Sequence, residues 1–461
     1  SAASTYNTAV GHHAGIAVTT GTNNTLIGGL AGDAITTGGD NVSVGFSSLS
    51  ATTTATNNSA VGTYALNANT TGGSNVAMGY NALGANTTAS NNTAIGTSAL
   101  TLNTTGANNV AVGYASLGAN TTGDDNASFG HGSLLVNTTG FQNTAVGRAA
   151  MDSNTTGSLN ASLGYTSLQK NTTGTNNTGL GHSALRANTT ASNNTAVGYN
   201  SLLANTTGTR NVALGASALD ANTVGDKNVA IGMDALGTNV DGSRSVAVGD
   251  SALAAQDPAS AVEMYNTAVG HAAGTAVTTG VRNALIGGLA GDALTTGDDN
   301  TAVGSFSLSA DTLGNRSTAI GHNALAVQNF TSSTSVYNTA VGYAAGAAVT
   351  TGVLNTLVGG LSGDALTSGN NNVAVGYLAL SADTLGDRNV AIGNSALTAQ
   401  NFTSSTDSYN TAVGFTAGAS VTTGTQNTLI GGLAGDALTT GSSNVAVGYG
   451  ALTTDDVGQW N

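Results

Sequence analysis

Histidine has the most obvious capacity for chemistry in this sequence, because its side chain binds metals and transfers protons near neutral pH. Five of the six histidines recur at one place of a short repeat: His12, His131, His182, His271 and His322. Other copies carry a different ring at that place, as at Tyr80, Tyr114, Tyr165, Tyr199 and Phe415. We interpret the histidines as members of an aromatic stripe, for which a structural role is favoured over stacking on sugars or on a receptor protein. The adjacent His12 and His13 have no further ligand at a metal-binding spacing.

Carboxylates are the second candidates, because they bind Ca²⁺ and catalyse acid–base reactions. The aspartates include three pairs and one series at equivalent repeat positions: Asp124-Asp125, Asp298-Asp299 and Asp455-Asp456, and then Asp33, Asp292, Asp364 and Asp436. No Asp-x-Asp-x-Asp-Gly calcium loop is present, so solvated turn residues are the favoured interpretation. Glu263 is the only Glu, which argues against the paired carboxylates of a glycoside hydrolase. Because Ser, His and Asp recur without a unique triad, we expect no enzyme, no cofactor and no metal.

Charge and composition argue against several classes of partner. The formal net charge is -14, and the nine Lys and Arg residues are scattered singly. Nucleic-acid backbones and anionic membrane surfaces attract clustered cations, so neither is an expected partner. No stretch approaches the roughly 20 apolar residues of a membrane span, so we expect no membrane insertion. The absence of Cys neither requires nor excludes an extracellular location.

The elements that must position these residues are copies of one repeat. The stretch 194–210 reads Asn-Thr-Ala-Val-Gly-Tyr-Asn-Ser-Leu-Leu-Ala-Asn-Thr-Thr-Gly-Thr-Arg, and the next copy opens at Asn211. The sequence contains 26 copies from residue 7 onward, separated by 22 intervals of 17 residues and three of 21. Such a short period over a whole chain is typical of a solenoid, in which each copy is one coil that packs against its neighbours. We therefore predict an all-β parallel β-solenoid with 17-residue coils.

The residue pattern within one copy predicts the conformation of the coil. Position 4 is always a large apolar residue and position 9 is usually Leu, whereas positions 3 and 8 are usually Ala. We expect two brief strands at positions 2–4 and 7–9, with the glycine of position 5 at the corner between them. Since neighbouring strand residues point to opposite faces, we expect the large residues to fill the interior and the Ala rows to form a flat second surface for another chain. Asn at positions 1, 12 and often 17 is expected to stack into hydrogen-bonded ladders.

Three regions of one continuous solenoid differ in the details of the repeat. Residues 1–57 are opening coils, residues 58–264 form a uniform shaft, and residues 265–461 carry a 72-residue cassette of three 17-residue copies and one 21-residue copy. The second copy of the cassette contains Gly-Gly-Leu-Ala-Gly-Asp or its Ser variant. Most shaft copies contain Asn-Thr-Thr, which matches the N-glycosylation pattern, although turn chemistry alone also explains Asn-Thr-Thr-Gly.

The three 21-residue copies contain the main departures from the regular coil. Each inserts four residues before the next copy and ends in Tyr, and two of them also contain Phe. The C-terminal stretch contains the only Trp. Insertions in a solenoid collect as loops on one face, which is often the binding face. The candidate binding residues are therefore Tyr265, Phe330, Tyr337, Phe402, Tyr409 and Trp460.

The run Ala-Met-Gly-Tyr-Asn-Ala-Leu at residues 77–83, with its variants throughout the chain, resembles the YadA-type head repeat of trimeric autotransporter adhesins, which also occurs in phage tail fibres. The resemblance covers nearly all 461 residues through a repeated Ala-x-Gly-x-x-Ala-x frame. It implies a left-handed parallel β-roll, a side-by-side homotrimer and a surface-exposed fibre used for attachment. The coil is longer than the usual head repeat, and no basic neck, heptad stalk or membrane anchor is visible. We therefore expect a fibre segment, a virion appendage or a secreted filament subunit.

The expected function is that of an extracellular, cell-surface or virion fibre that presents an attachment surface to a cell-surface protein or glycan. The expected partner in assembly is the chain itself, as a homotrimer whose coil ends could also stack end to end. Two alternatives stay open. One is a self-assembling secreted filament subunit, and the other is an ice-binding β-solenoid that uses its regular Thr-Thr pairs.

Overall fold

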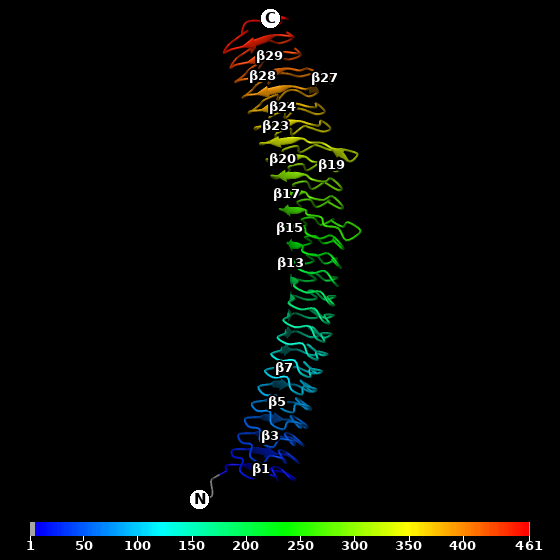
Figure 1. Cartoon of the computed structure of the whole chain (residues 1–461), viewed down its shortest axis with the longest axis vertical. Helices are drawn as coiled ribbons and strands as arrows, with labels where there is room; N and C mark the ends of the chain where they lie inside the picture. Colours follow the sequence, from blue (N-terminus) through cyan, green and yellow to red (C-terminus); the bar gives the residue numbers. More distant parts are fainter. Residues whose placement is uncertain (1–4, 461) are drawn as a thin grey trace. The chain divides into compact units, whose positions relative to one another are not determined.

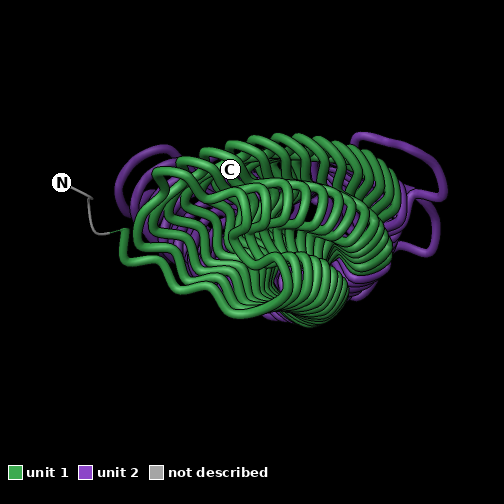
Figure 2. Tube along the Cα trace, turned by 90° about the horizontal axis from the view of Figure 1, so that it is seen from below, with its two compact units in different colours: residues 1–227 green, residues 228–461 purple. Residues whose placement is uncertain are grey.

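The computed structural model describes residues 5–460, which form strands and turns and contain no helix. It divides into two compact units after Lys227, which Figure 2 colours separately. Within residues 5–460, each unit contains thirteen strands of three residues, one for each copy of the repeat. None of the described residues belongs to a helix that could cross a membrane.

The three-residue strands of the first unit are β1 (Thr8–Val10), β2 (Thr25–Ile27), β3 (Val42–Val44), β4 (Ser59–Val61), β5 (Val76–Met78), β6 (Thr93–Ile95), β7 (Val110–Val112), β8 (Ala127–Phe129), β9 (Thr144–Val146), β10 (Ala161–Leu163), β11 (Thr178–Leu180), β12 (Thr195–Val197) and β13 (Val212–Leu214). Those of the second unit are β14 (Val229–Ile231), β15 (Val246–Val248), β16 (Thr267–Val269), β17 (Ala284–Ile286), β18 (Thr301–Val303), β20 (Thr318–Ile320), β22 (Thr339–Val341), β23 (Thr356–Val358), β24 (Val373–Val375), β26 (Val390–Ile392), β28 (Thr411–Val413), β29 (Thr428–Ile430) and β30 (Val445–Val447).

Within each unit the strands of successive copies pair in parallel, so the coils stack in sequence order (Figure 1). In the pair β12 and β13, Ala196 lies opposite Ala213 and Val197 lies opposite Leu214. Partners are therefore one repeat apart, and the register holds across the longer copies, where Val390 of β26 lies opposite Thr411 of β28. The prediction of a parallel β-solenoid with 17-residue coils is confirmed.

The expected second strand at positions 7–9 is wrong, because these positions form consecutive turns. In the coil 194–210, Asn200 and Leu202 have φ angles of 55° and 51°. These angles are left-handed and incompatible with a strand. The side chain of Leu202 is nevertheless fully buried. Position 9 thus fills the interior as expected, but a turn directs it there.

The side chains at positions 3 and 4 of the strand point in the directions opposite to those predicted. Ala196 at position 3 is fully buried, whereas the position-4 residues Met78 and Leu214 are 44% and 46% exposed. The leucine of position 9 occupies the interior beside the strand: a Cβ built at Gly179, a position-3 residue, would lie 3.3 Å from Cγ of Leu168. Only a small residue therefore fits at position 3 where position 9 is leucine. The predicted interior location of the position-4 residues and the predicted exposed Ala surface are both wrong.

Glycine forms the corner after each strand, as expected. Gly198 has a φ of 133°, and a Cβ built on it would lie 2.4 Å from the carbonyl oxygen of Gly215 in the next coil. Residues with a side chain rarely adopt this backbone conformation. The corner therefore requires glycine both for its conformation and for the close approach of neighbouring coils.

Two ladders of buried asparagines join the coils at positions 1 and 12, which confirms this part of the prediction. The backbone N–H of Asn194 donates to Oδ1 of Asn177 at 3.0 Å, and its Nδ2 donates to the carbonyl of Gly208 at 2.8 Å. Nδ2 of Asn205 donates to Oδ1 of Asn188 at 3.1 Å and to the same Gly208 carbonyl at 3.0 Å. Asn205 begins an Asn-Thr-Thr motif and is fully buried, so its amide is not accessible for glycosylation in the folded chain.

The cassette packs its interior around a leucine at position 3. Leu357 is fully buried where most coils carry Ala. Position 9 is glycine in the same coil and in the preceding one, and a Cβ built at Gly363 or Gly346 would lie 2.8 or 2.7 Å from a methyl carbon of Leu357. In the cassette the interior is thus filled by a leucine on the strand, at position 3. In the other coils the same space is filled by a leucine in the turn, at position 9. The same arrangement surrounds Leu26, Leu285 and Leu429.

The 21-residue copies keep the solenoid register and project as loops (Figure 1). Two of them add a parallel pair of two-residue strands, namely β19 (Gly314–Asn315) with β21 (Thr334–Ser335) and β25 (Gly386–Asp387) with β27 (Thr406–Asp407). Gln replaces Asn at position 12 of these copies. Nε2 of Gln328 donates to Oδ2 of Asp311 at 2.6 Å, and its Oε1 accepts from Nδ2 of Asn338 at 2.9 Å. The longer side chain therefore connects the two ladders.

Candidate functional site

The strands present a charge-free outer face in each unit. Its rows are position 2, which is Thr, Val, Ser or Ala in every copy, and position 4, which is Val, Ile, Leu, Met or Phe. Phe129 and Leu163 are 41% and 49% exposed. Leu163 and Leu180 also line a shallow apolar depression of about 190 Å³. The other position-4 residues are half-buried or exposed. A long row of accessible apolar side chains is typical of a protein–protein interface.

The three loop tyrosines are about half exposed, and an arginine of the preceding coil covers each ring. Cζ of Arg316 lies 5.5 Å from the ring centroid of Tyr337, and its Nη1 donates to the tyrosine Oη at 2.9 Å. Arg388 covers Tyr409 in the same way and also pairs with Asp407. A cation over an aromatic face is a stabilising contact. Each arginine therefore fixes the orientation of its tyrosine.

In the first loop, the arginine and the tyrosine both contact a glutamate, and the three side chains form a cluster. Nη2 of Arg244 lies 2.7 Å from Oε1 of Glu263, and Oη of Tyr265 donates to Oε2 of the same carboxylate at 2.5 Å. This hydrogen bond raises the pKa of the Tyr265 phenol. The three clusters recur 72 residues apart. The structure therefore places the loop tyrosines in three separate, equivalent clusters and does not gather them into one site.

The remaining predicted binding residues differ in accessibility. Phe330 and Phe402 are only 7% and 6% exposed, so their rings belong to the interior of the looped coils and leave the tyrosines as the accessible aromatic residues there. Trp460 is 82% exposed, and its backbone N–H donates to the carbonyl of Ser442 at 3.4 Å. Position in the sequence alone does not distinguish these cases, because inserted aromatic residues serve packing as well as binding.

The predicted aromatic stripe at position 6 is present as short runs of neighbouring rings, which other residues interrupt. The ring centroids of Tyr114 and His131 lie 5.1 Å apart with an interplanar angle of 20°. The ring of His182 lies 5.2 Å from that of Tyr165 and 5.4 Å from that of Tyr199. These distances are those of favourable aromatic pairs. The stripe is therefore both a packing element and an exposed surface.

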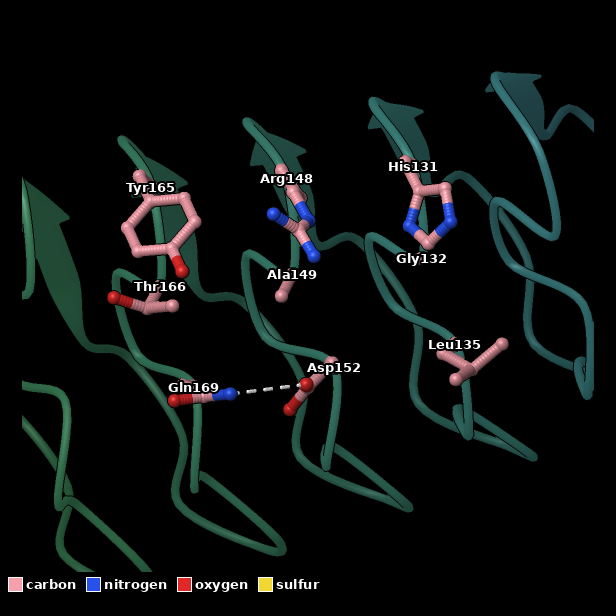
Figure 3. Close-up of a pocket in the computed structure, with 9 residues that line it drawn as sticks. All are labelled: His131, Gly132, Leu135, Arg148, Ala149, Asp152, Tyr165, Thr166 and Gln169. Carbon is pink, nitrogen blue, oxygen red and sulfur yellow. Dashed lines mark hydrogen bonds between the residues drawn. The ribbon is translucent and has the colours of Figure 1, made fainter.

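Arg148 interrupts this row between His131 and Tyr165, and a surface pocket of about 290 Å³ lies beside it (Figure 3). One wall is the position-6 row, and the other wall contains Asp152 and Gln169 at position 10 of their coils. The residues at position 7 are small or short, which leaves room between the walls: Gly132, Ala149 and Thr166. Sequence reasoning missed this pocket. Its only signal is an arginine within a run of rings, next to two adjacent copies with polar residues at position 10.

The aspartate series does not form a metal centre in the described part of the chain. Asp33, Asp292, Asp364 and Asp436 each have one buried Oδ1 without a hydrogen-bond partner. Burial raises the pKa of Asp292 and Asp364. Within residues 5–460, however, no three His or acidic side chains gather as a metal-binding group.

One of the acidic pairs is half-buried and takes part in an ion pair. Oδ1 of Asp299 lies 2.6 Å from Nε of Arg282, and this contact lowers the pKa of Asp299. Two other aspartates replace Asn in the buried position-12 ladder. Oδ1 of Asp311 accepts the backbone N–H of Gly314 at 3.0 Å, and Asp383 makes the equivalent contact. Burial raises the pKa of Asp311 and of Asp383.

Comparison of the chain with protein-family models gives no match, and comparison with curated protein sequences gives no significant relative. The functional interpretation therefore depends on the residues and on their geometry.

Proposed function

We propose that this protein is a non-enzymatic structural fibre that stands outside a cell or on a virion and presents an attachment surface to a cell-surface protein or glycan. The observation that carries the proposal is the charge-free apolar face along the strands of each unit. A face of this kind favours lateral association with chains that share its repeat. The attachment role and the left-handed winding come from the resemblance to adhesin head repeats.

The proposed assembly is a homotrimer in which the strand faces of three chains cover one another. A stable partner must match an apolar row that repeats at the coil spacing of about 4.8 Å. A second copy of the same chain supplies such a row without a new sequence pattern. The exposed position-4 residues, rather than the Ala rows, are then the contact residues.

Light scattering on the full chain tests this assembly. We expect a mass three times the chain mass of 44.5 kDa. A mass equal to one chain would contradict the trimer and the proposed role of the strand face.

Cross-linking locates the interface, because the chain contains no native Cys. A single Ile95→Cys substitution on the strand face should give covalent pairs of chains with a short bismaleimide. The matched control is Thr207→Cys, which places the thiol at exposed position 14 and should remain unlinked. Equal cross-linking of both variants would argue against the strand face as the interface.

Ice binding and filament formation are the alternative proposals. Most coils carry a Thr-Thr pair at positions 13 and 14, whose second residue, such as Thr207, is exposed, and this repeated row favours ice binding. The first threonine of the pair is already used, since Oγ1 of Thr206 donates to the carbonyl of Thr223 at 3.1 Å. A thermal hysteresis measurement tests ice binding. Electron microscopy distinguishes particles of one length from the continuous filaments that end-to-end stacking would produce.

A further inference from the structure

The pocket beside Arg148 combines three kinds of group on one exposed surface. Rings lie on both sides of the arginine along the position-6 row, which offers apolar faces for stacking. Cζ of Arg148 lies 5.9 Å from the ring centroid of Tyr165, and among residues 5–460 its guanidinium takes part in no ion pair. Figure 3 shows the ring of His131, the guanidinium of Arg148 and the ring of Tyr165 side by side along one wall.

Polar groups on the opposite wall are held in place by a chain of hydrogen bonds. Nε2 of Gln169 donates to Oδ2 of Asp152 at 3.2 Å, and Nε of Arg186 donates to Oε1 of Gln169 at 3.2 Å. Oδ1 of Asp152 accepts from Oγ of Ser153 at 2.9 Å. A carboxylate has about four acceptor sites, so Asp152 retains capacity for further donors such as hydroxyl groups. The wall is thus a preorganised acceptor.

We propose that this pocket binds a saccharide unit that bears a carboxylate. The apolar C–H face of a sugar ring stacks on the side chains of the position-6 row, its hydroxyl groups donate to Asp152, and its carboxylate accepts from the guanidinium of Arg148. Arginine is suited to this role because its planar fork matches a carboxylate with two parallel hydrogen bonds. The volume of about 290 Å³ is at the lower end for small-molecule pockets, which fits one sugar unit. The pocket is lined by residues at positions 6, 7 and 10, whereas the strand face is formed by positions 2 and 4.

This inference deepens the proposed attachment function and rests on it for its biological meaning. The binding itself is measured on the full chain with free sugars, and the oligomeric mass of the same sample is measured by light scattering. Loss of sugar binding with an intact trimer therefore overturns the pocket alone. A monomeric mass with retained sugar binding overturns the proposed assembly alone.

Saturation-transfer NMR titrations with glucuronic acid and N-acetylneuraminic acid test the pocket, with glucose and inorganic phosphate as comparison ligands. We expect at least one of the two acidic sugars to bind at least tenfold more tightly than glucose or phosphate. Arg148→Gln should weaken this binding at least tenfold, and Tyr165→Ala should also weaken it.

Two matched controls keep the test specific. Arg210→Gln makes the same charge change at position 17, away from the pocket, and Tyr80→Ala removes a position-6 ring of another coil. Both should bind within twofold of the unaltered chain. The proposal is overturned if neither acidic sugar binds, if glucose binds equally well, or if Arg148→Gln binds like Arg210→Gln. Circular dichroism of each variant verifies that the solenoid is folded.

Discussion

At position 5 of the repeat, the absence of a side chain allows neighbouring coils to approach each other. Gly287 has a φ of 133°, and a Cβ built on it would lie 2.6 Å from the carbonyl carbon of Gly304. The next residue, Gly288, has no positive φ, and its built Cβ would be 4.0 Å from the nearest atom, Oγ of Ser305. Gly287 is therefore required by its backbone conformation and by the close approach of the next coil, whereas the space around Gly288 would admit a methyl group.

We expect Gly287→Ala to destabilise the second unit by more than about 2 kcal/mol, because both the backbone conformation and the space oppose a methyl group. Gly288→Ala should change stability by less than about 0.5 kcal/mol. Thermal unfolding followed by circular dichroism compares the two variants. Equal unfolding temperatures would contradict this account of the corner.

Buried aspartates and an ion-paired aspartate should have pKa values shifted in opposite directions. Burial raises the pKa of Asp311 and Asp383 above the ordinary value of 3.8, whereas the contact with Arg282 lowers that of Asp299. A raised folded-state pKa gives a stability contribution that is fully present below the unfolded value and is lost as pH rises through the folded value. The contribution of Asp299 has the opposite pH dependence. It is present above the unfolded value and is lost as pH falls through the lowered folded pKa.

Carbon-13 NMR of the carboxyl groups tests these directions, with Asp311→Asn and Asp299→Asn used for assignment. We expect the midpoint of Asp311 above 3.8 and that of Asp299 below it. The double variant Asp311→Asn and Asp383→Asn should lose less thermal stability than the unaltered chain as pH rises above 3.8, because the pKa of both carboxyl groups is raised. An equal loss in both proteins would show that the buried carboxyls do not carry this dependence.

At the scale of the coil, two different side-chain patterns fill the same interior. Regular coils combine Ala at position 3 with Leu at position 9, as in Ala196 and Leu202. The cassette combines Leu357 at position 3 with glycine at position 9. Interiors are close-packed, so either pattern is stable only when both positions change together.

A double-mutant cycle at Leu357 and Gly363 measures this dependence. Leu357→Ala leaves a cavity and should cost about 2–5 kcal/mol, and Gly363→Leu forces a side chain against Leu357 and should cost about 1–3 kcal/mol. The double variant should cost less than the sum of the single costs. Gly363→Leu fills the cavity that Leu357→Ala leaves, and Leu357→Ala removes the side chain with which Gly363→Leu clashes. Denaturation midpoints of the four proteins give the coupling free energy between the two positions. Additive costs would contradict the view that both side chains fill the same space.

At the scale of the whole molecule, stability is distributed over contacts between neighbouring coils. In both units each strand pairs with the strands of adjacent copies, and side chains such as Asn194 and Asn205 bond one repeat away. Solenoids of this kind approach a sum of nearest-neighbour terms. Local damage should therefore remain local.

Hydrogen exchange of the Gly287→Ala variant tests this locality. We expect faster amide exchange in the coils around residues 283–304 and unchanged exchange in residues 24–107 of the first unit. The Gly288→Ala variant serves as the control and should match the unaltered chain in both regions. A uniform loss of protection along the chain would instead indicate a single cooperative unit.

Some features of this protein follow from the sequence because they depend on nearest neighbours only. The period of 17 residues determines which residues stack, so the parallel register, the glycine corner at Gly198 and the ladders through Asn194 and Asn205 are all predictable. Each of these features repeats the same local geometry in successive copies.

Only the tertiary structure decided which side of the strand faces inward. Alternation requires Ala196 and Val197 to point to opposite faces, but it does not say which face is inside. The left-handed turn at Leu202 settles this, because it directs the leucine into the interior and leaves space for only a small residue on the strand. Three-dimensional packing likewise buried Phe330 and opened the pocket beside Arg148, since both depend on how much space the adjacent coils leave.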